Sequence, residues 1–400
     1  MHSRRGVLRG LAGSGLSMGI AACGELPRGA AVPRAEATRA TVLGLPNERF
    51  HPVVDMKLVQ EELMQAAQRR ARFHGVASPF DMPQFEMLAV SGGGEDGAFG
   101  AGLLCGWSAQ GGRPVFDWVT GVSTGALTAP FAFLGSGYDD KLRAVYTEVS
   151  AKDILVPRGI IAALTDDALA DNAPLFATIS RYLDERMVQD LAGAYRDGRL
   201  LFIGTSDFDA QLGVIWNIGA IAASGHPRAV DTIRRILLAS AAIPGAFPPT
   251  MFDVTLDGRP YQEMHVDGGA FAQAFLYPPA LTTQRRQRTT AGQRVLKAEA
   301  YVIRNGRLDP NWARTKRQTL GIVGRAIDTM ITVSGINDVI RIYNTTRTDG
   351  IDFKLAYIGT DFTKVSPEPF DRAYMRSLFD YAYAQARNGY PWAGKPPFAA

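Results

Sequence analysis

Cysteine is nearly absent from this chain of 400 residues, which contains only Cys23 and Cys105. Two cysteines cannot build the disulfide framework that holds many small secreted domains together, so a hydrophobic core must stabilise the fold. Hydrophobic residues make up 46% of the sequence, which is enough for a large core. Cys105 lies among Leu103, Leu104 and Trp107, and we expect it to be a small buried residue.

Long apolar runs and excess charge are also lacking. No stretch approaches the ~20 consecutive apolar residues that cross a bilayer. The formal net charge is +4, and three of the cations, Arg4, Arg5 and Arg9, lie at the start of the chain, which leaves +1 for the rest. The basic character of the whole sequence therefore does not indicate nucleic-acid binding. No Cys/His spacing is typical of a metal site, and we predict neither a metal nor a cofactor.

The first residues resemble a bacterial export signal. Residues 3–9 follow the twin-arginine pattern, and an apolar stretch from Gly10 to Ala22 follows that is too short to span a membrane. Residues 20–23, Ile-Ala-Ala-Cys, resemble a lipobox, in which the cysteine receives lipid. We predict that residues 1–22 are a signal peptide and that Cys23 anchors the chain in the cell envelope, facing the periplasm or in the outer membrane. A plain cleaved signal peptide with an incidental cysteine is the alternative.

Residues 23–50 are rich in Ala, Arg and Pro and have no periodicity, so we expect a flexible tether there. Residues 51–400 would then form one catalytic domain. Within it, the apolar residues of 318–343 recur at helical spacing, which predicts a helix that faces the core. A lipid-facing or substrate-lining helix is the alternative. The polar, basic stretch 285–294 is interpreted as a solvated loop.

Ser123 lies in the sequence Gly121-Val122-Ser123-Thr124-Gly125, between a strand-like run and a helix-compatible run. This spacing suits a sharp strand-to-helix turn that exposes the serine hydroxyl, because Gly121 and Gly125 have no Cβ atoms to crowd the turn. Such a turn is the usual support of a nucleophilic serine.

A second glycine-rich loop follows the strand-like run 87–91. It spans Gly92 to Gly97 and leads into a helix, so its backbone N–H groups favour negative charge. The pattern G-x-G-x-x-G with Asp117 about twenty residues on would suit a dinucleotide. An oxyanion hole for Ser123 is the other interpretation. The two loops are separated by one βαβ unit, which places both at the same edge of a parallel sheet and favours the oxyanion hole.

Asp267 is the candidate base, in the sequence His265-Val266-Asp267-Gly268-Gly269. A serine hydroxyl needs a base within hydrogen-bond reach before it can attack, although an ordinary Asp-Gly turn is the alternative for these residues. His265 shares a face with Asp267 on a strand. A Ser-His-Asp triad would need it to reach Ser123, and we expect a structural role for His265 instead.

Together these motifs resemble the patatin-like phospholipase family. Two further segments, Gly204–Asp209 and Ala239–Pro249, resemble its central strand and its proline-rich block. The resemblance implies an α/β fold with three layers, in which helices cover both faces of a mostly parallel sheet. It also implies a dyad of Ser123 as nucleophile and Asp267 as proton acceptor. The implied oxyanion hole consists of Gly92, Gly93, Gly94 and Gly97, with support from Gly121, Gly125, Gly268 and Gly269.

One position departs from the family pattern. The family usually has Arg or Lys before the last glycine of the oxyanion loop, whereas this chain has Asp96 beside Glu95. We therefore expect an acidic rim that disfavours strongly anionic substrates. The sequence predicts a serine acyl-hydrolase that acts on lipid or other acyl esters at a membrane surface, with no prediction for its oligomeric state. A catalytically silent scaffold lipoprotein of the same fold is the alternative.

Overall fold

A computed structural model describes residues 26–52, 54–159, 166–310 and 312–398. The predicted signal peptide, Cys23 and the beginning of the predicted tether lie outside the described residues. Export and lipidation therefore stay predictions from the sequence.

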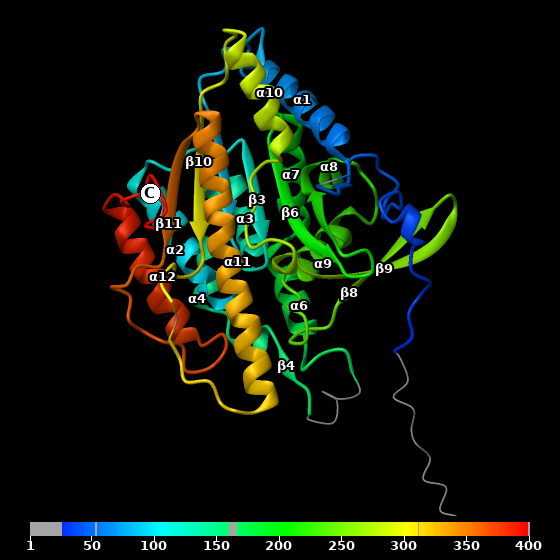
Figure 1. The fold of residues 1–400 in the computed structure, drawn as a ribbon, viewed down its shortest axis with the longest axis vertical. Helices are drawn as coiled ribbons and strands as arrows, with labels where there is room; N and C mark the ends of the chain where they lie inside the picture. The colour runs from blue at the N-terminus through cyan, green and yellow to red at the C-terminus, as the bar shows by residue number, and fades with distance from the viewer. Residues whose placement is uncertain (1–25, 53, 160–165, 311, 399–400) are drawn as a thin grey trace, which may run out of the picture.

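A twisted sheet forms the centre of the molecule (Figure 1). In the described residues it has nine strands, and along the main path the order is β1-β7-β6-β3-β2-β10-β11, with β9 pairing β6 and β8. Strands β11, β10, β2, β3 and β6 are parallel, whereas β1, β7, β8 and β9 add antiparallel pairs at one side. The strands are β1 Arg49–Phe50, β2 Phe85–Val90, β3 Trp118–Val122, β6 Leu200–Asp207, β7 Leu212–Asn217, β8 Thr250–Leu256, β9 Arg259–Asp267, β10 Ala298–Arg304 and β11 Asp352–Tyr357; β4 Val156–Pro157 and β5 Ala170–Asp171 form a separate small ribbon.

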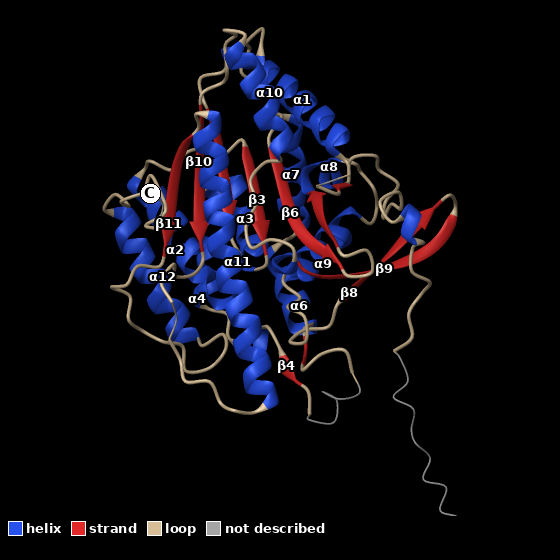
Figure 2. Ribbon diagram, viewed as in Figure 1, coloured by secondary structure: helices blue, strands red, loops and turns tan. Residues whose placement is uncertain are grey.

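Helices cover both faces of this sheet, as Figure 2 shows. Successive residues of β2 alternate between two cores, because Leu88 and Val90 face one layer and Met87 and Ala89 the other. The three-layer, mostly parallel α/β fold is confirmed. The helices of the first layer are α2 Gly97–Gln110, α3 Thr124–Leu134, α4 Asp139–Thr147, α6 Ala173–Tyr182, α7 Glu185–Arg196, α8 Ile218–Ala223, α9 Ala229–Ser240 and α12 Arg372–Arg387; those of the second are α1 Met56–Phe73, α10 Pro279–Thr290 and α11 Thr319–Asp349.

The prediction of a flexible tether is wrong for residues 26–50, which are the part of the predicted tether that the structure describes. Arg28 forms an ion pair with Asp209 on the domain surface, and β1 joins the edge of the sheet. Arg49 lies deeper, where its guanidinium bonds both carboxylate oxygens of Glu263 on β9 at 2.5 and 3.0 Å. Residues 26–50 therefore belong to the folded domain, because their sparse apolar and charged side chains find partners on β7–β9 that sequence periodicity does not reveal.

Two further expectations need correction. Helix α10 covers most of the stretch interpreted as a loop, with Pro279 at its first position, where a proline costs no hydrogen bond. The long helix α11 contacts the core only in its second half, through residues such as Val339 and Ile342. Its first half exposes Ile322, Val323, Ile327 and Met330. The expectation of a core-facing helix is wrong there.

Among the residues described, no helix combines the length and the apolar character needed to cross a bilayer.

Candidate active site

Ser123 forms a strained turn between β3 and α3. Its backbone has φ 56° and ψ −128°, a conformation that a residue with a side chain rarely adopts. The residue is buried, with 6% of its surface exposed. Strain of this kind persists only where the surrounding structure enforces it, and it concentrates at functional sites.

The two glycines of the motif allow the chain to pack tightly around this turn. A Cβ atom on Gly125 would lie 2.2 Å from the carbonyl oxygen of Val90, at the end of the neighbouring strand β2. A Cβ on Gly121 would lie 2.5 Å from the carbonyl oxygen of Gly125. Both glycines are therefore required sterically, and the serine is pressed against the loop that follows β2.

Asp267 ends β9, and its backbone pairs with Thr205 of β6. Its Oδ1 accepts a hydrogen bond of 2.7 Å from the amide of Gly269. Within the described part of the chain, Oδ2 has no hydrogen-bond partner of good geometry. Burial raises the pKa of Asp267 to about 7, although the Ser123 hydroxyl and the Gly269 amide act in the opposite direction. The carboxyl group is thus close to Ser123 and has one oxygen available for a proton.

Gly268 and Gly269 allow the chain to turn tightly after Asp267. A Cβ on Gly268 would lie 2.3 Å from the carbonyl oxygen of Gly204 on β6. A Cβ on Gly269 would lie 2.4 Å from Nε2 of Gln273. The turn therefore brings the amide of Gly269 back onto the carboxylate of Asp267.

A single segment at the end of α9 holds both residues in place. The amide of Ser123 donates to Oγ of Ser240 at 3.0 Å, and that hydroxyl donates to the carbonyl oxygen of Gly204 at 2.7 Å. Two residues further on, the carbonyl oxygen of Ala242 accepts the amide of Asp267 at 2.9 Å. In the sequence this block is indicated by resemblance only. Its role could not be predicted, because hydrogen bonds between separate segments of the chain leave no spacing signal.

The glycine loop of residues 92–97 lies directly against the serine turn. Gly93 and Gly94 have φ of 157° and 57°, and no acceptor in the described chain takes their amide hydrogens. The resemblance also implied that the amides of Gly92 and Gly97 contribute to the oxyanion hole. The structure does not support this, because both amides already have acceptors within the protein. The amide of Gly92 donates to Gln273, and that of Gly97 bonds within its own turn. Both are glycines for steric reasons: Cβ atoms there would lie 3.2 Å from Cβ of Ser123 and 2.1 Å from Oγ1 of Thr124, respectively.

Arg304 and Asn305, at the end of β10, fix this loop from behind. Arg304 donates to the carbonyl oxygen of Gly92 at 2.9 Å. Asn305 donates through Nδ2 to the carbonyl oxygen of Ser91 at 2.9 Å and accepts the amide of Gly100 at 3.0 Å. These two polar residues are almost completely buried. In the sequence the Arg-Asn pair comes directly after the apolar run 300–303, and a polar pair at such a strand end is the signal that could have identified them.

The acidic pair beside the loop does not form the rim that the sequence suggested. Oδ1 of Asp96 accepts a hydrogen bond of 2.6 Å from the hydroxyl of Tyr374 on α12. Burial raises the pKa of Asp96 to about 6. The Glu95 carboxylate accepts the amide of Phe370, and burial raises the pKa of this group too. Both acids therefore hold the loop against the α12 region, and only Glu95 borders the pocket.

His265 does not take part in a triad. Its Nδ1 lies 2.9 Å from Oγ1 of Thr205 and its Nε2 lies 3.1 Å from the Glu263 carboxylate, so both ring nitrogens are engaged. His265, Glu263 and Asp207 present possible ligand atoms within 4.8 Å of one another. Arg49 supplies a positive charge to this group directly, through both oxygens of Glu263. The cluster is thus a buried ion-pair network beneath the site, and His265 has the structural role expected.

The position of Asp117 is inconsistent with a dinucleotide site at the glycine loop. It precedes β3, so it lies at the opposite end of that strand from Ser123 and the loop. There it accepts hydrogen bonds from Arg70 at 2.6 Å and from the amide of Glu86 at 3.0 Å. An acidic residue that recognises a ribose would have to lie at the loop's own edge of the sheet.

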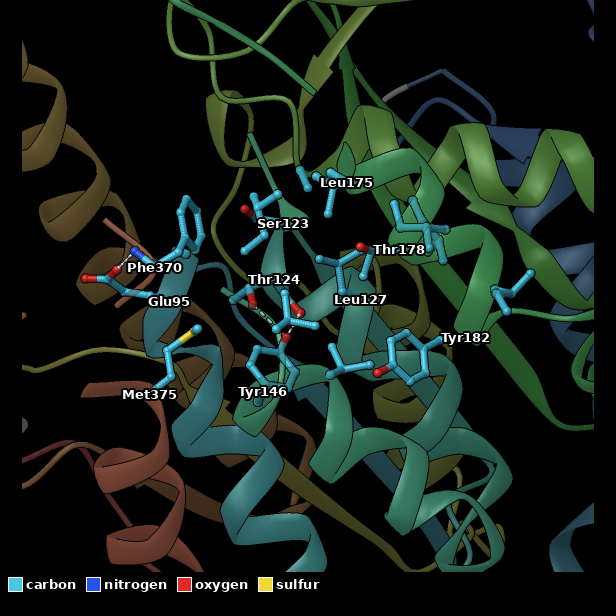
Figure 3. A pocket seen from close by; sticks show the side chains of 18 of the residues that line it. Glu95, Ser123, Thr124, Leu127, Tyr146, Leu175, Thr178, Tyr182, Phe370 and Met375 are labelled. Carbon is cyan, nitrogen blue, oxygen red and sulfur yellow. Dashed lines mark hydrogen bonds between the residues drawn. The ribbon is translucent and has the colours of Figure 1, made fainter. Parts of the chain in front are cut away.

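A pocket lined almost entirely by apolar side chains opens beside Ser123 (Figure 3). Leu127 lies one helical turn after Ser123 on α3, and Leu175, Thr178 and Tyr182 come from α6. On the other side, Phe370 and Met375 flank the serine. An apolar cavity of this kind suits a hydrocarbon chain.

These features define the protein's class: an α/β fold that presents a serine turn and an apolar pocket at the carboxyl edge of its sheet. The model of the patatin-like phospholipase family matches residues 88–278. The chain therefore contains a patatin-like phospholipase domain, and the match confirms the resemblance seen in the sequence. The presence of this domain supports lipid hydrolase activity.

Comparison with other proteins adds distant likenesses. No curated protein matches the sequence. Among solved structures, the chain is similar to VipD from Legionella pneumophila, at 12% identity and a TM-score of 0.35, over 76% of this chain and 67% of that one. It is also similar to human GIVD cytosolic phospholipase A2, at 10% identity and a TM-score of 0.30, over 82% of this chain. The chain spans 56% of that human protein.

Substitution of Gly125 by alanine tests the crowding of the serine turn. The new Cβ would clash with the Val90 carbonyl, so β2 and α3 must separate, and we expect Gly125→Ala to cost about 1–3 kcal/mol in unfolding free energy. Urea unfolding measures this change. Gly137→Ala is the control, since a Cβ at this exposed glycine meets nothing within 4 Å. Equal stability of the two variants would contradict the crowding.

The buried carboxyl group of Asp267 predicts a pH-dependent stability. Its pKa is 3.8 when unfolded and about 7 in the fold, so the folded state holds the proton more tightly. The stability that this tighter proton binding provides is complete below the pKa of the unfolded chain, 3.8, and is lost as the pH rises through about 7. We therefore expect the unfolding free energy of Asp267→Asn, relative to wild type, to increase by about 2–3 kcal/mol from pH 5 to pH 8.

Unfolding in urea at several pH values measures this trend, with the exposed Asp253→Asn on β8 as the matched control. A stability difference between Asp267→Asn and wild type that stays constant over this range would show that the carboxyl group is not desolvated as described.

Proposed function

We propose that this chain is a serine acyl-hydrolase that cleaves lipid acyl esters through a dyad of Ser123 and Asp267. The observation that carries the proposal is a strained serine next to a buried carboxyl group of raised pKa, at the mouth of an apolar pocket. Perturbed carboxyl groups in such clefts are typical of general bases. A pKa near 7 is also well matched to proton transfer at neutral pH.

In the proposed first step, Asp267 accepts the proton of the Ser123 hydroxyl while Oγ attacks the ester carbonyl carbon. The carbonyl π electrons move to the oxygen, and the amides of Gly93 and Gly94 stabilise this oxyanion. When the tetrahedral intermediate collapses, the bond to the alcohol oxygen breaks. Asp267 returns the proton to the departing alcohol, and the acyl group stays on Ser123.

In the second step, water takes the place of the alcohol. Asp267 accepts a proton from the water, the hydroxide adds to the acyl carbon, and the same amides stabilise the oxyanion. Collapse releases the carboxylic acid, and the proton on Asp267 returns to Oγ of Ser123. The apolar pocket would hold the acyl chain through both steps, because its walls offer hydrocarbon contact and few polar partners.

The sequence predictions for the leader belong to this proposal. Lipidation of Cys23 and export to the cell envelope would bring the enzyme to a membrane, where its substrates occur. A water-soluble ester of the same acyl group would then serve as a substrate in a test without the membrane.

Ester turnover by the dyad variants tests the proposal. We expect Ser123→Ala and Asp267→Asn each to lower the hydrolysis of p-nitrophenyl esters by about a thousandfold or more, since the nucleophile or its base is lost. The exposed Ser136→Ala should keep wild-type turnover. Undiminished hydrolysis in either dyad variant would overturn the mechanism, and an inactive, folded wild type would favour the silent scaffold.

The pocket predicts a dependence on acyl chain length. Leu127→Phe would fill space next to Ser123, so we expect hydrolysis of a dodecanoyl ester to fall well below wild type while that of an acetyl ester is retained. Leu134→Phe, on the same helix but outside the pocket, is the matched control. Equal losses for both chain lengths would argue against acyl binding in this cavity.

A further inference from the structure

The first half of α11 carries an apolar face that points away from the protein. Its exposed apolar residues come at spacings of one, three and four, and on a helix of 3.6 residues per turn they lie within about 140° of one another. Exposed fractions reach 52% for Ile322 and 70% for Met330. The residues of this face are Ile322, Val323, Ala326, Ile327, Met330 and Val333; we call them the outer face of α11.

Exposure of this kind is unusual for a helix of a globular domain, which normally turns its apolar residues inward. Further along α11 the usual arrangement returns, since Val339 and Ile342 are buried against the sheet. A contiguous exposed apolar patch on a protein surface often marks an interaction site.

Positive charge gathers at the N-terminal end of the outer face. Between residues 312 and 333 the chain has four cations, three of them in the segment 314–317 just before the helix, and a single anion, Asp328. Trp312 lies at the start of this segment and is 86% exposed. An exposed tryptophan, basic side chains and an aliphatic helix face together are typical of helices that lie in the interface of an anionic bilayer.

The first half of α11 lies at the same edge of the sheet as the active site. In Figure 1 the first half of α11 extends beyond the carboxyl ends of β10 and β3, toward the β4 ribbon. Ser123 and the glycine loop follow β3 and β2 at that same edge of the sheet. Other exposed apolar side chains occur there too, namely Val156 on β4 and Leu169 just before β5, at 52% and 49% exposure.

We infer that the outer face of α11 docks the protein onto an anionic phospholipid surface, with Trp312 and the basic segment 314–317 at the level of the headgroups. The apolar face would replace water by acyl chains, while the cations would contact lipid phosphates. This surface does not include Cys23.

Quenching of Trp312 fluorescence by vesicles with brominated acyl chains tests this inference. The full chain carries Ser123→Ala, so that the lipids stay intact whether or not the proposed hydrolysis is correct. We expect quenching on vesicles of phosphatidylcholine with phosphatidylglycerol and weaker quenching on phosphatidylcholine alone. Trp312→Phe should remove the quenched component, and because the signal comes from Trp312, an anchor elsewhere in the chain does not produce it.

Two double variants, each of which adds two negative charges, show whether binding depends on the outer face or on α11 in general. Val323→Glu with Met330→Glu should weaken vesicle binding by about tenfold or more, because charged groups would have to enter the acyl region. Asn344→Glu with Thr348→Glu, at exposed positions near the other end of the helix, should bind as the parent does.

Three results would overturn the inference. The first is quenching that persists unchanged in the Val323→Glu, Met330→Glu variant. The second is an absence of Trp312 quenching on anionic vesicles. The third is a dimer in sedimentation that the same two substitutions dissociate, without quenching, since the face would then pair two copies of the chain.

Discussion

The desolvation of one carboxyl group is the constraint on which this site depends. Asp267 is buried, and its pKa is raised to about 7. An aspartate in water would be too weak a base to activate a serine at neutral pH. In the proposed mechanism, removal of Asp267 from water provides the basicity that a histidine provides in other serine hydrolases. Burial of this group costs stability. Hydrogen bonds from the Gly269 amide and the Ser123 hydroxyl stabilise the carboxylate and partly offset that cost.

The surrounding structure fixes the position of that carboxyl group relative to the serine. Three strand ends, those of β2, β3 and β9, converge there, and each carries glycines where a side chain would clash. One segment, Ser240–Ala242, holds the backbone of Ser123 and of Asp267 together. Arg304 and Asn305 hold the glycine loop from the other side. The result is a preorganised site, in which few groups need to move when charge develops.

The sequence predicted what depends on local spacing. The turn at Ser123, the loop after β2 and the aspartate at the end of β9 each have a glycine signature within a few residues. The resemblance of these motifs to the patatin-like family implied the mostly parallel sheet. Contacts between distant segments could not be predicted. Arg28, Arg39 and Arg49 each form an ion pair with an acidic residue more than 150 residues away. The amide of Gly92 donates to the carbonyl oxygen of Gln273. Helix α11 was misjudged in its first half because periodicity identifies an apolar face but not what covers it.

The most direct test of the account is the rate at which a fluorophosphonate labels Ser123, measured from pH 5 to pH 9. The reagent reports an activated serine without requiring the natural substrate. The account predicts a rate that rises with a single ionisation near pH 7, the pKa of Asp267, and that is lost in Ser123→Ala. In Asp267→Asn the rate should be low and independent of pH. Labelling of Asp267→Asn at the wild-type rate, or a wild-type rate without an ionisation near neutrality, would contradict it.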